Sequence, residues 1–233
     1  MTRPPFLSGS IWPIHPCPLP DELLSSWMVR IARAYGVPPQ SFWHQLASIS
    51  QFRALDGQVS PRVLEALHRG TRIKPSQIRA MTLASFTEWG LLRIGNHPVI
   101  AFCPKCLGAP IPFYRRTWCL EFVTICTIHY VELQNDCPAC GALIRLEHVR
   151  VNQSLAACHN CGCDLAAVST STYEPSDQLA TVLVHQNYLA RQLENWDDAA
   201  TCQLSEARCR ASNVGDASPA NRRSTHQTRA GSR

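Results

Sequence analysis

Eight side chains of metal-binding type stand in four pairs between Cys103 and Cys161, with two residues between the members of each pair. A two-residue gap lets both side chains point inward from one tight turn, and two such turns supply the four ligands of a closed tetrahedral zinc site. The pattern therefore predicts two zinc ions per chain. The predicted ligands are Cys103, Cys106, Cys126, His129, Cys137, Cys140, Cys158 and Cys161.

The spacing favours a sequential grouping, in which the first two pairs form one site and the last two form the other. The gap between the two pairs is 19 residues in the first site and 17 in the second, enough for a hairpin in each. An interleaved, cross-braced grouping would use the same ligands and stays open; it is the topology that a RING-like ligase requires. Replacement of Cys161 by Cys163 or His159 also stays open.

Closed sites of this kind are structural, because a catalytic zinc keeps one coordination position for water. The sequence also has no G-x-x-x-x-G-K-[ST] phosphate loop, no G-x-S-x-G elbow and no H-E-x-x-H pair. We therefore predict no catalytic residue and no enzymatic activity. The metal is expected to fold its region, since a short cysteine-rich stretch cannot build a sufficient hydrophobic core alone.

Composition sets broad limits on the 233-residue chain, which has 45% hydrophobic residues and a net charge of +5. Twelve cysteines without a visible export signal are typical of a reducing cytoplasm. Residues 1–100 carry ten Lys and Arg against five Asp and Glu, whereas residues 101–175 carry five against six. This bias is compatible with a nucleic-acid surface in the first hundred residues.

The elements that must position these residues begin with helices. Apolar side chains at helical spacing predict one helix from Asp21 to Gly36 and a second from Gln40 to about Ser50. A third has Ser60 as its N-cap, begins at Pro61 and is expected to stop at Gly70. A fourth begins at Pro75.

The turn between the third and fourth helices has the proportions of a helix-turn-helix, although a plain helical hairpin with a solvated basic face fits equally well. Arginine and lysine side chains near this turn, together with two arginines between the first two cysteine pairs, are candidates for phosphate contacts. These candidates are Arg62, Arg72, Lys74, Arg79, Arg115 and Arg116.

From Phe102 the sequence predicts short strands at 122–125 and 143–146, then a final helix over 176–196. The fold class is therefore α+β and mostly helical: a helix-turn-helix-like region, two zinc-ribbon-like fingers and a C-terminal helix. The expected domains are 1–100 for the N-terminal helices, 101–168 for the double zinc finger, 169–210 for the last helix and 211–233 for a disordered tail.

Several segments, in order, resemble the TniQ (TnsD-related) family of transposon proteins. They are Pro18-Leu19-Pro20-Asp21-Glu22-Leu23-Leu24-Ser25-Ser26-Trp27, the Phe102-Cys103-Pro104-Lys105-Cys106-Leu107 segment, Tyr114-Arg115-Arg116 with Trp118, Cys126-x2-His129, and Cys137-Pro138-x-Cys140-Gly141. Together they cover about residues 10–165. The resemblance implies zinc at the eight ligands named above.

By this resemblance the protein would be an adaptor for transposition target selection. Its partners would be the transposon AAA+ ATPase, together with target DNA or an RNA-guided effector complex, and it could form a homodimer. It would work in the bacterial cytoplasm, on the nucleoid when bound to DNA. Many relatives continue past this length with further helical DNA-binding segments, so autonomous sequence-specific DNA binding is not implied. The alternative is a zinc-stabilised protein-interaction scaffold that makes no direct contact with DNA.

Overall fold

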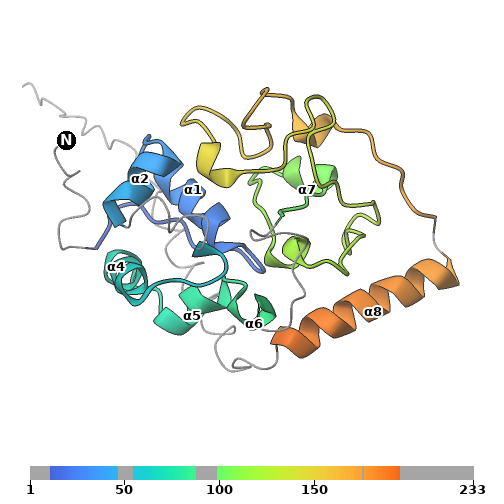
Figure 1. Ribbon diagram of the computed structural model, residues 1–233, viewed down its shortest axis with the longest axis horizontal. Helices are drawn as coiled ribbons and strands as arrows, with labels where there is room; N and C mark the ends of the chain where they lie inside the picture. The colour runs from blue at the N-terminus through green and yellow to red at the C-terminus, as the bar shows by residue number, and fades with distance from the viewer. Residues whose placement is uncertain (1–10, 47–54, 88–98, 175, 195–233) are drawn as a thin grey trace, which may run out of the picture. The chain divides into compact units, whose positions relative to one another are not determined.

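Helix α1, Leu24–Ala34, contributes side chains to two hydrophobic cores. Trp27, Met28 and Ile31 pack into the core of the N-terminal helices, whereas Val29 joins the core of the cysteine-rich region. The structure is a computed structural model that describes residues 11–46, 55–87, 99–174 and 176–194, all within one compact unit. Figure 1 shows their arrangement.

The predicted opening turn of this helix, from Asp21, is not helical. The first turn of α1 instead begins at Leu24 and is capped by residues distant in the sequence. Asp21 adopts a left-handed conformation with φ of 59°, so the helix begins three residues later than the sequence indicates. The free backbone N–H of Leu24 donates to the Met81 carbonyl at 3.0 Å, and that of Ser25 donates to the Asp56 carboxylate at 2.8 Å. Donors without intrahelical partners are thereby satisfied by other elements.

The helices after α1 complete the N-terminal core. They are α2, Pro39–Leu46, α4, Pro61–Thr71, α5, Pro75–Ala80, and the single turn α6, Ala84–Thr87. The predicted extension of the second helix to Ser50 lies outside the described residues. The Ser60 cap is confirmed, since its hydroxyl accepts a hydrogen bond from the Val63 N–H.

Helix α4 ends one residue beyond the predicted stop. Gly70 lies inside the helix, and the left-handed C-cap is Arg72, with φ of 60°. The glycine is needed because the Trp12 ring packs against its Cα: an added Cβ would lie 2.2 Å from that indole. The backbone N–H of Trp12 also donates to the backbone carbonyl of Gly70 at 2.7 Å.

The cysteine-rich region contains short helices and turns. Its helical elements are α7, Pro104–Leu107, and three 3-10 turns, η3, Arg116–Cys119, η4, Leu146–His148, and η5, Leu165–Ala167. The predicted strands at 122–125 and 143–146 are wrong: the described part of the chain has isolated bridges, such as Asp136 with Leu143, and no sheet. The fold is mostly helical, and Figure 1 accordingly draws coil between the short helices of this region.

Two acidic residues precede α1, and the side chain of one of them, Asp21, joins the helical and cysteine-rich regions. Asp21 accepts hydrogen bonds from Thr117, and its carboxylate lies 3.6 Å from the Arg116 guanidinium. Glu22 is 1% exposed and pairs with Arg30 at 2.6 Å. Burial raises the pKa of both carboxyl groups, and the neighbouring arginines oppose that shift.

The last described element is α8, Asp177–Glu194, whose N-terminus is capped by the Ser176 hydroxyl. Gln186 fixes the helix to the first cysteine loop. Its side-chain oxygen accepts from the N–H groups of Thr124 and Ile125, and its amide donates to the Ile125 carbonyl. The predicted helix end at residue 196 and the predicted tail over 211–233 lie outside the described residues. Among the described helices, none is long and apolar enough to cross a membrane.

Candidate metal centres

Three of the four predicted ligand pairs share one backbone turn. In each, the N–H of the first ligand donates to the carbonyl five residues later, and its carbonyl accepts from the N–H four residues later. The fourth residue after the first ligand has positive φ in every case: Tyr130 at 53°, Gly141 at 67° and Gly162 at 79°. We call these turns knuckles. The fourth pair, Cys103 and Cys106, instead uses the N-terminus of α7.

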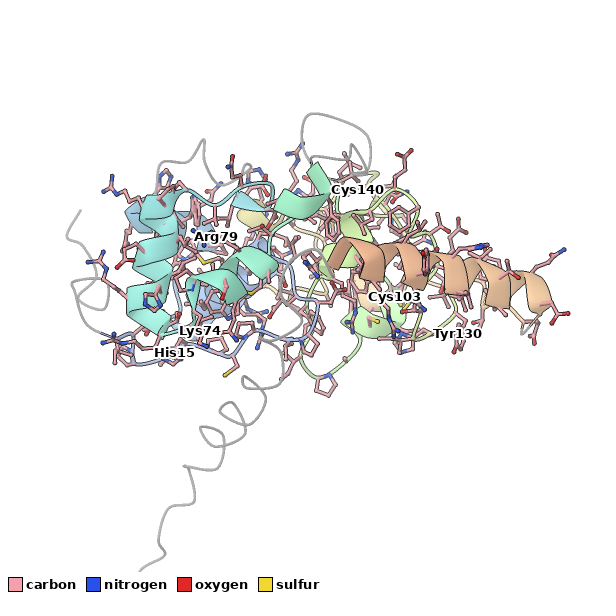
Figure 2. The ribbon with its side chains drawn as sticks, turned by 90° about the horizontal axis from the view of Figure 1, so that it is seen from below. His15, Lys74, Arg79, Cys103, Tyr130 and Cys140 are labelled. Atoms are coloured by element: carbon pink, nitrogen blue, oxygen red, sulfur yellow. The ribbon has the colours of Figure 1, made fainter. Side chains whose placement is uncertain are left out.

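The knuckle geometry points the side chains of each pair in one direction, and the pairs meet sequentially. Cys103, Cys106, Cys126 and His129 form the first group, and Cys137, Cys140, Cys158 and Cys161 form the second. Within each group the four ligand atoms lie within 4.8 Å of one another. The interleaved topology that a RING-like ligase needs is therefore absent from these eight residues. Figure 2 labels one cysteine of each group, Cys103 and Cys140.

The distances within the groups fit a tetrahedral zinc ion. Zn–S bonds of about 2.3 Å and Zn–N bonds of about 2.0 Å place two sulfurs about 3.8 Å apart and a sulfur and a nitrogen about 3.5 Å apart. In the first group Cys106 and Cys126 Sγ are 3.7 Å apart, and Cys103 Sγ lies 3.5 Å from His129 Nδ1. In the second, the Cys137–Cys161 and Cys140–Cys158 sulfurs are 3.6 and 3.7 Å apart. Each group could therefore hold a metal ion.

Thiolates are the metal-binding form of cysteine, and in each group one cysteine has a lowered pKa while neighbouring cysteines have a raised pKa. Hydrogen bonds from the Cys103 and Cys106 thiols lower the pKa of Cys126 to about 2. In the second group a hydrogen bond from the Asn160 amide is the main cause that lowers the pKa of Cys140 to about 6. Soft thiolate and imidazole donors together suit zinc better than magnesium or calcium.

Cys163 and His159, the two alternatives to Cys161 as a ligand, lie outside both groups. Cys163 supplies the carbonyl that closes the third knuckle, in the place that Val131 and Ala142 occupy in the other two. The His159 ring stacks on that of His148 with centroids 5.7 Å apart. Cys163 thus takes part in the repeated turn through its backbone, and its thiol lies outside the second group.

The four candidate phosphate-binding residues around α4 and α5 are all exposed: Arg62, Arg72, Lys74 and Arg79. Arg72 is the C-cap of α4 and Lys74 is the N-cap of α5, so the turn between the helices carries both charges. Arg79 lies in the last turn of α5. Figure 2 labels Lys74 and Arg79 on this short helix.

The other two candidates, Arg115 and Arg116, lie in a different environment. The Arg116 side chain is 11% exposed, pairs with Asp21 and lies over the Phe86 ring. The Arg115 guanidinium lies over the Phe113 ring, 4.7 Å from its centroid. The structure therefore separates these two from the basic turn and gives them contacts within the protein.

Tyr130 occupies a special backbone position that was not predicted from the sequence. It is the first residue after the Cys126-x2-His129 pair, where the two cysteine-only knuckles have glycine. The left-handed conformation costs a non-glycine residue about 1–2 kcal/mol. The signal was present in the sequence, since Gly141 and Gly162 occupy the same place after their pairs.

Comparison with known proteins identifies a family for this chain. A search of the curated proteins found no match. The TniQ family profile matches residues 13–133, about half of the chain, and this range contains α1 to η3 and the whole first ligand group. The second group lies beyond the matched residues. The chain belongs to the TniQ family, and membership implies an accessory role in the selection of transposition targets.

Proposed function

We propose that this protein is a target-selection adaptor of transposition, which binds DNA or a targeting complex and recruits the transposon AAA+ ATPase. The observation that carries the proposal is the family match, which covers both the helical region and the first metal group. The adaptor would be a binding protein without chemistry of its own, because each candidate metal centre presents four protein ligands and leaves no position for water.

Two structural zinc ions per chain are part of the proposal. The first would be held by Cys103, Cys106, Cys126 and His129, and the second by Cys137, Cys140, Cys158 and Cys161. The distances given above support four-ligand sites of tetrahedral size. Bound zinc would supply folding free energy to a region that has short 3-10 turns and isolated bridges in place of a sheet.

Direct DNA contact would come from the basic turn between α4 and α5. Arg62, Arg72, Lys74 and Arg79 are exposed there, as phosphate-binding side chains must be. A protein that neutralises phosphates releases counterions, so its affinity falls as salt rises. We expect the Arg72→Gln and Lys74→Gln pair to weaken duplex binding and to reduce the slope of log K against log salt by about 2.

The test combines two binding measurements on the zinc-loaded chain. Electrophoretic shift assays across a salt series measure DNA binding, and a pull-down with the cognate ATPase measures recruitment. The Arg69→Gln variant, on the exposed side of α4 where Arg69 already pairs with Glu65, serves as the control for loss of one positive charge outside the turn. A protein that neither binds DNA nor retains the ATPase would refute the adaptor proposal.

The alternative is an interaction scaffold whose contact with DNA comes only through its partners. The contacts that Arg115 and Arg116 make within the protein favour this alternative, since four of the six candidate phosphate contacts are exposed. Retention of the ATPase without any salt-dependent DNA complex would select the scaffold over the DNA-binding adaptor.

A further inference from the structure

A cleft of about 180 Å³ lies between α8 and the first knuckle. Pockets for free small molecules usually measure about 300–1,000 Å³, so this one has room for a single side chain. Helix α8 forms one wall, and Gln186 holds that wall in place through its hydrogen bonds to Thr124 and Ile125. The residues that matter for recognition are Arg115, Thr117, Ile128, Asn187 and Arg191.

The cleft offers two guanidinium groups, and the Cys126 ligand is also part of its lining. Arg115 and Arg191 both line it, and its one acidic residue, Asp21, is already engaged by Thr117 and Arg116. The Nε atom of Arg115 is buried and has no hydrogen-bond partner within the described structure. A buried donor of this kind is costly unless something accepts from it.

The rim of the cleft is apolar on both sides. On the knuckle side Ile128 lines the cleft and is 52% exposed. On the α8 side Val184 and Tyr188 are 64% and 58% exposed. They precede Asn187 and Arg191 by three residues each, so they lie next to these two cleft-lining residues on the helix surface, on the side turned away from Gln186.

The strained Tyr130 stands two residues beyond Ile128. Its side chain is 45% exposed, so packing within the described structure does not explain a tyrosine at a position that favours glycine. Backbone strain that persists at an exposed side chain is typical of a binding surface. The segment after the fingers is fixed beside it, because the Tyr173 N–H donates to the Tyr130 carbonyl at 2.9 Å.

We propose that this cleft, with Ile128, Tyr130, Val184 and Tyr188 around it, binds an extended segment of a protein partner. The segment places one acidic side chain between Arg115 and Arg191 and sets large apolar residues against the rim. Guanidinium groups pair strongly with carboxylates, and exposed tyrosines are preferred residues at protein interfaces. The inference is independent of DNA binding by α4 and α5.

Charge and surface character distinguish this occupant from two others. The chain's own segment from Ala199 to Arg233 carries six arginines against two acidic residues, so its charge does not complement the two arginines of the cleft. A nucleic-acid backbone would leave the exposed Val184 and Ile128 side chains without apolar contacts, and a peptide of alternating acidic and apolar residues satisfies both.

The test selects random dodecapeptides displayed on phage against the full zinc-loaded chain. Counter-selection uses the Arg191→Gln, Tyr130→Asn double variant. Both changes are at exposed side chains, and asparagine tolerates the left-handed conformation, so the variant retains its fold. We expect the selected peptides to be enriched in an Asp or Glu next to a large apolar residue.

A selected peptide and its twin with Gln in place of the acid are then measured by fluorescence anisotropy. The acid-to-amide change and Arg191→Gln should each weaken binding about fivefold, the size expected for loss of one charge-assisted contact of about 1 kcal/mol. The Arg69→Gln control should bind as the wild type does. Selection without acidic enrichment, or equal affinity of the two twins, would overturn the proposal. So would an Arg191-dependent complex with a single-stranded oligonucleotide that excludes the peptide, which would assign the cleft to nucleic acid.

Discussion

The contact between Trp12 and Gly70 shows how a single hydrogen atom can decide whether two segments pack. Trp12 is 3% exposed and lies directly over the Cα of Gly70 inside α4. An ordinary helix interior disfavours glycine relative to alanine by about 1 kcal/mol, so intrinsic propensity alone would favour alanine here. The close approach of the indole ring outweighs that preference.

We therefore expect Gly70→Ala to lower the free energy of unfolding by about 1–3 kcal/mol, because the new methyl group would overlap the Trp12 ring. Urea denaturation followed by tryptophan fluorescence measures the change. The exposed Ser76→Ala on α5 is the matched control and should be neutral. A Gly70→Ala protein as stable as the wild type would contradict the packing argument.

Asp56 is the second residue with a measurable consequence. The fully buried Asp56 carboxylate caps α1 by accepting a hydrogen bond from the Ser25 N–H. Burial raises the pKa of Asp56 from 3.8 to about 6, and the hydrogen bonds from Ser25 oppose that shift. A folded-state pKa above the unfolded value means that the folded protein holds the proton more tightly. This contribution to stability is complete below the unfolded pKa and is lost as the pH rises through about 6.

An Asp56→Asn variant should lack that pH dependence. Between pH 5.5 and 7.5 its free energy of unfolding should therefore rise relative to the wild type by about 1 kcal/mol. The comparison is made by urea denaturation at fixed zinc, and the exposed Asp177→Asn is the control. Parallel pH profiles of variant and wild type would show that Asp56 does not titrate in this range.

The knuckles show which parts of the site could be predicted from the sequence. The C-x2-C and C-x2-H spacings identify the eight residues that come together, because a two-residue gap brings both side chains of a pair to one side, from a knuckle or from the first turn of α7. The predicted hairpin strands failed for a physical reason. In the predicted strands, Val123, Ile144 and Leu146 pack into the core of the cysteine-rich region, and the backbone there pairs through isolated bridges.

The same comparison holds for α1 and α4. Helical periodicity located both, while their ends depended on distant residues: Asp21 turns left-handed to reach Thr117, and Gly70 stays helical to receive Trp12. Such tertiary contacts cannot be predicted from the sequence around the helix ends. The cleft beside α8 was likewise invisible, since its lining combines residues from three separate segments of the chain.

The attachment of α8 depends on Gln186, which is 4% exposed. Gln186→Ala would leave the N–H groups of Thr124 and Ile125 without this acceptor, at a cost of about 2 kcal/mol. We expect faster amide hydrogen exchange throughout α8 and at these two residues, with the exposed His185→Ala as the control. Unchanged exchange in α8 would show that its apolar contacts suffice to hold it.

For the whole molecule, the two ligand groups share no residue, so their metals should be lost independently. Cys137→Ser should lower the zinc content from two ions per chain to one and destabilise the region after residue 130. Cys163→Ser should retain both ions, because Cys163 contributes its carbonyl to the third knuckle. Elemental analysis of the purified proteins checks both. Two zinc ions in the Cys137→Ser protein would refute the second site.

Helix α1 has one further consequence, since its opposite faces belong to different cores. Loss of metal would loosen the packing around Val29, and the same rigid helix carries Trp27 and Ile31 into the core on which α4 rests. A chelator should therefore disturb the basic turn at a distance, without touching it. In a cell, the availability of zinc would then set the fraction of this protein whose basic turn is in place to engage a target.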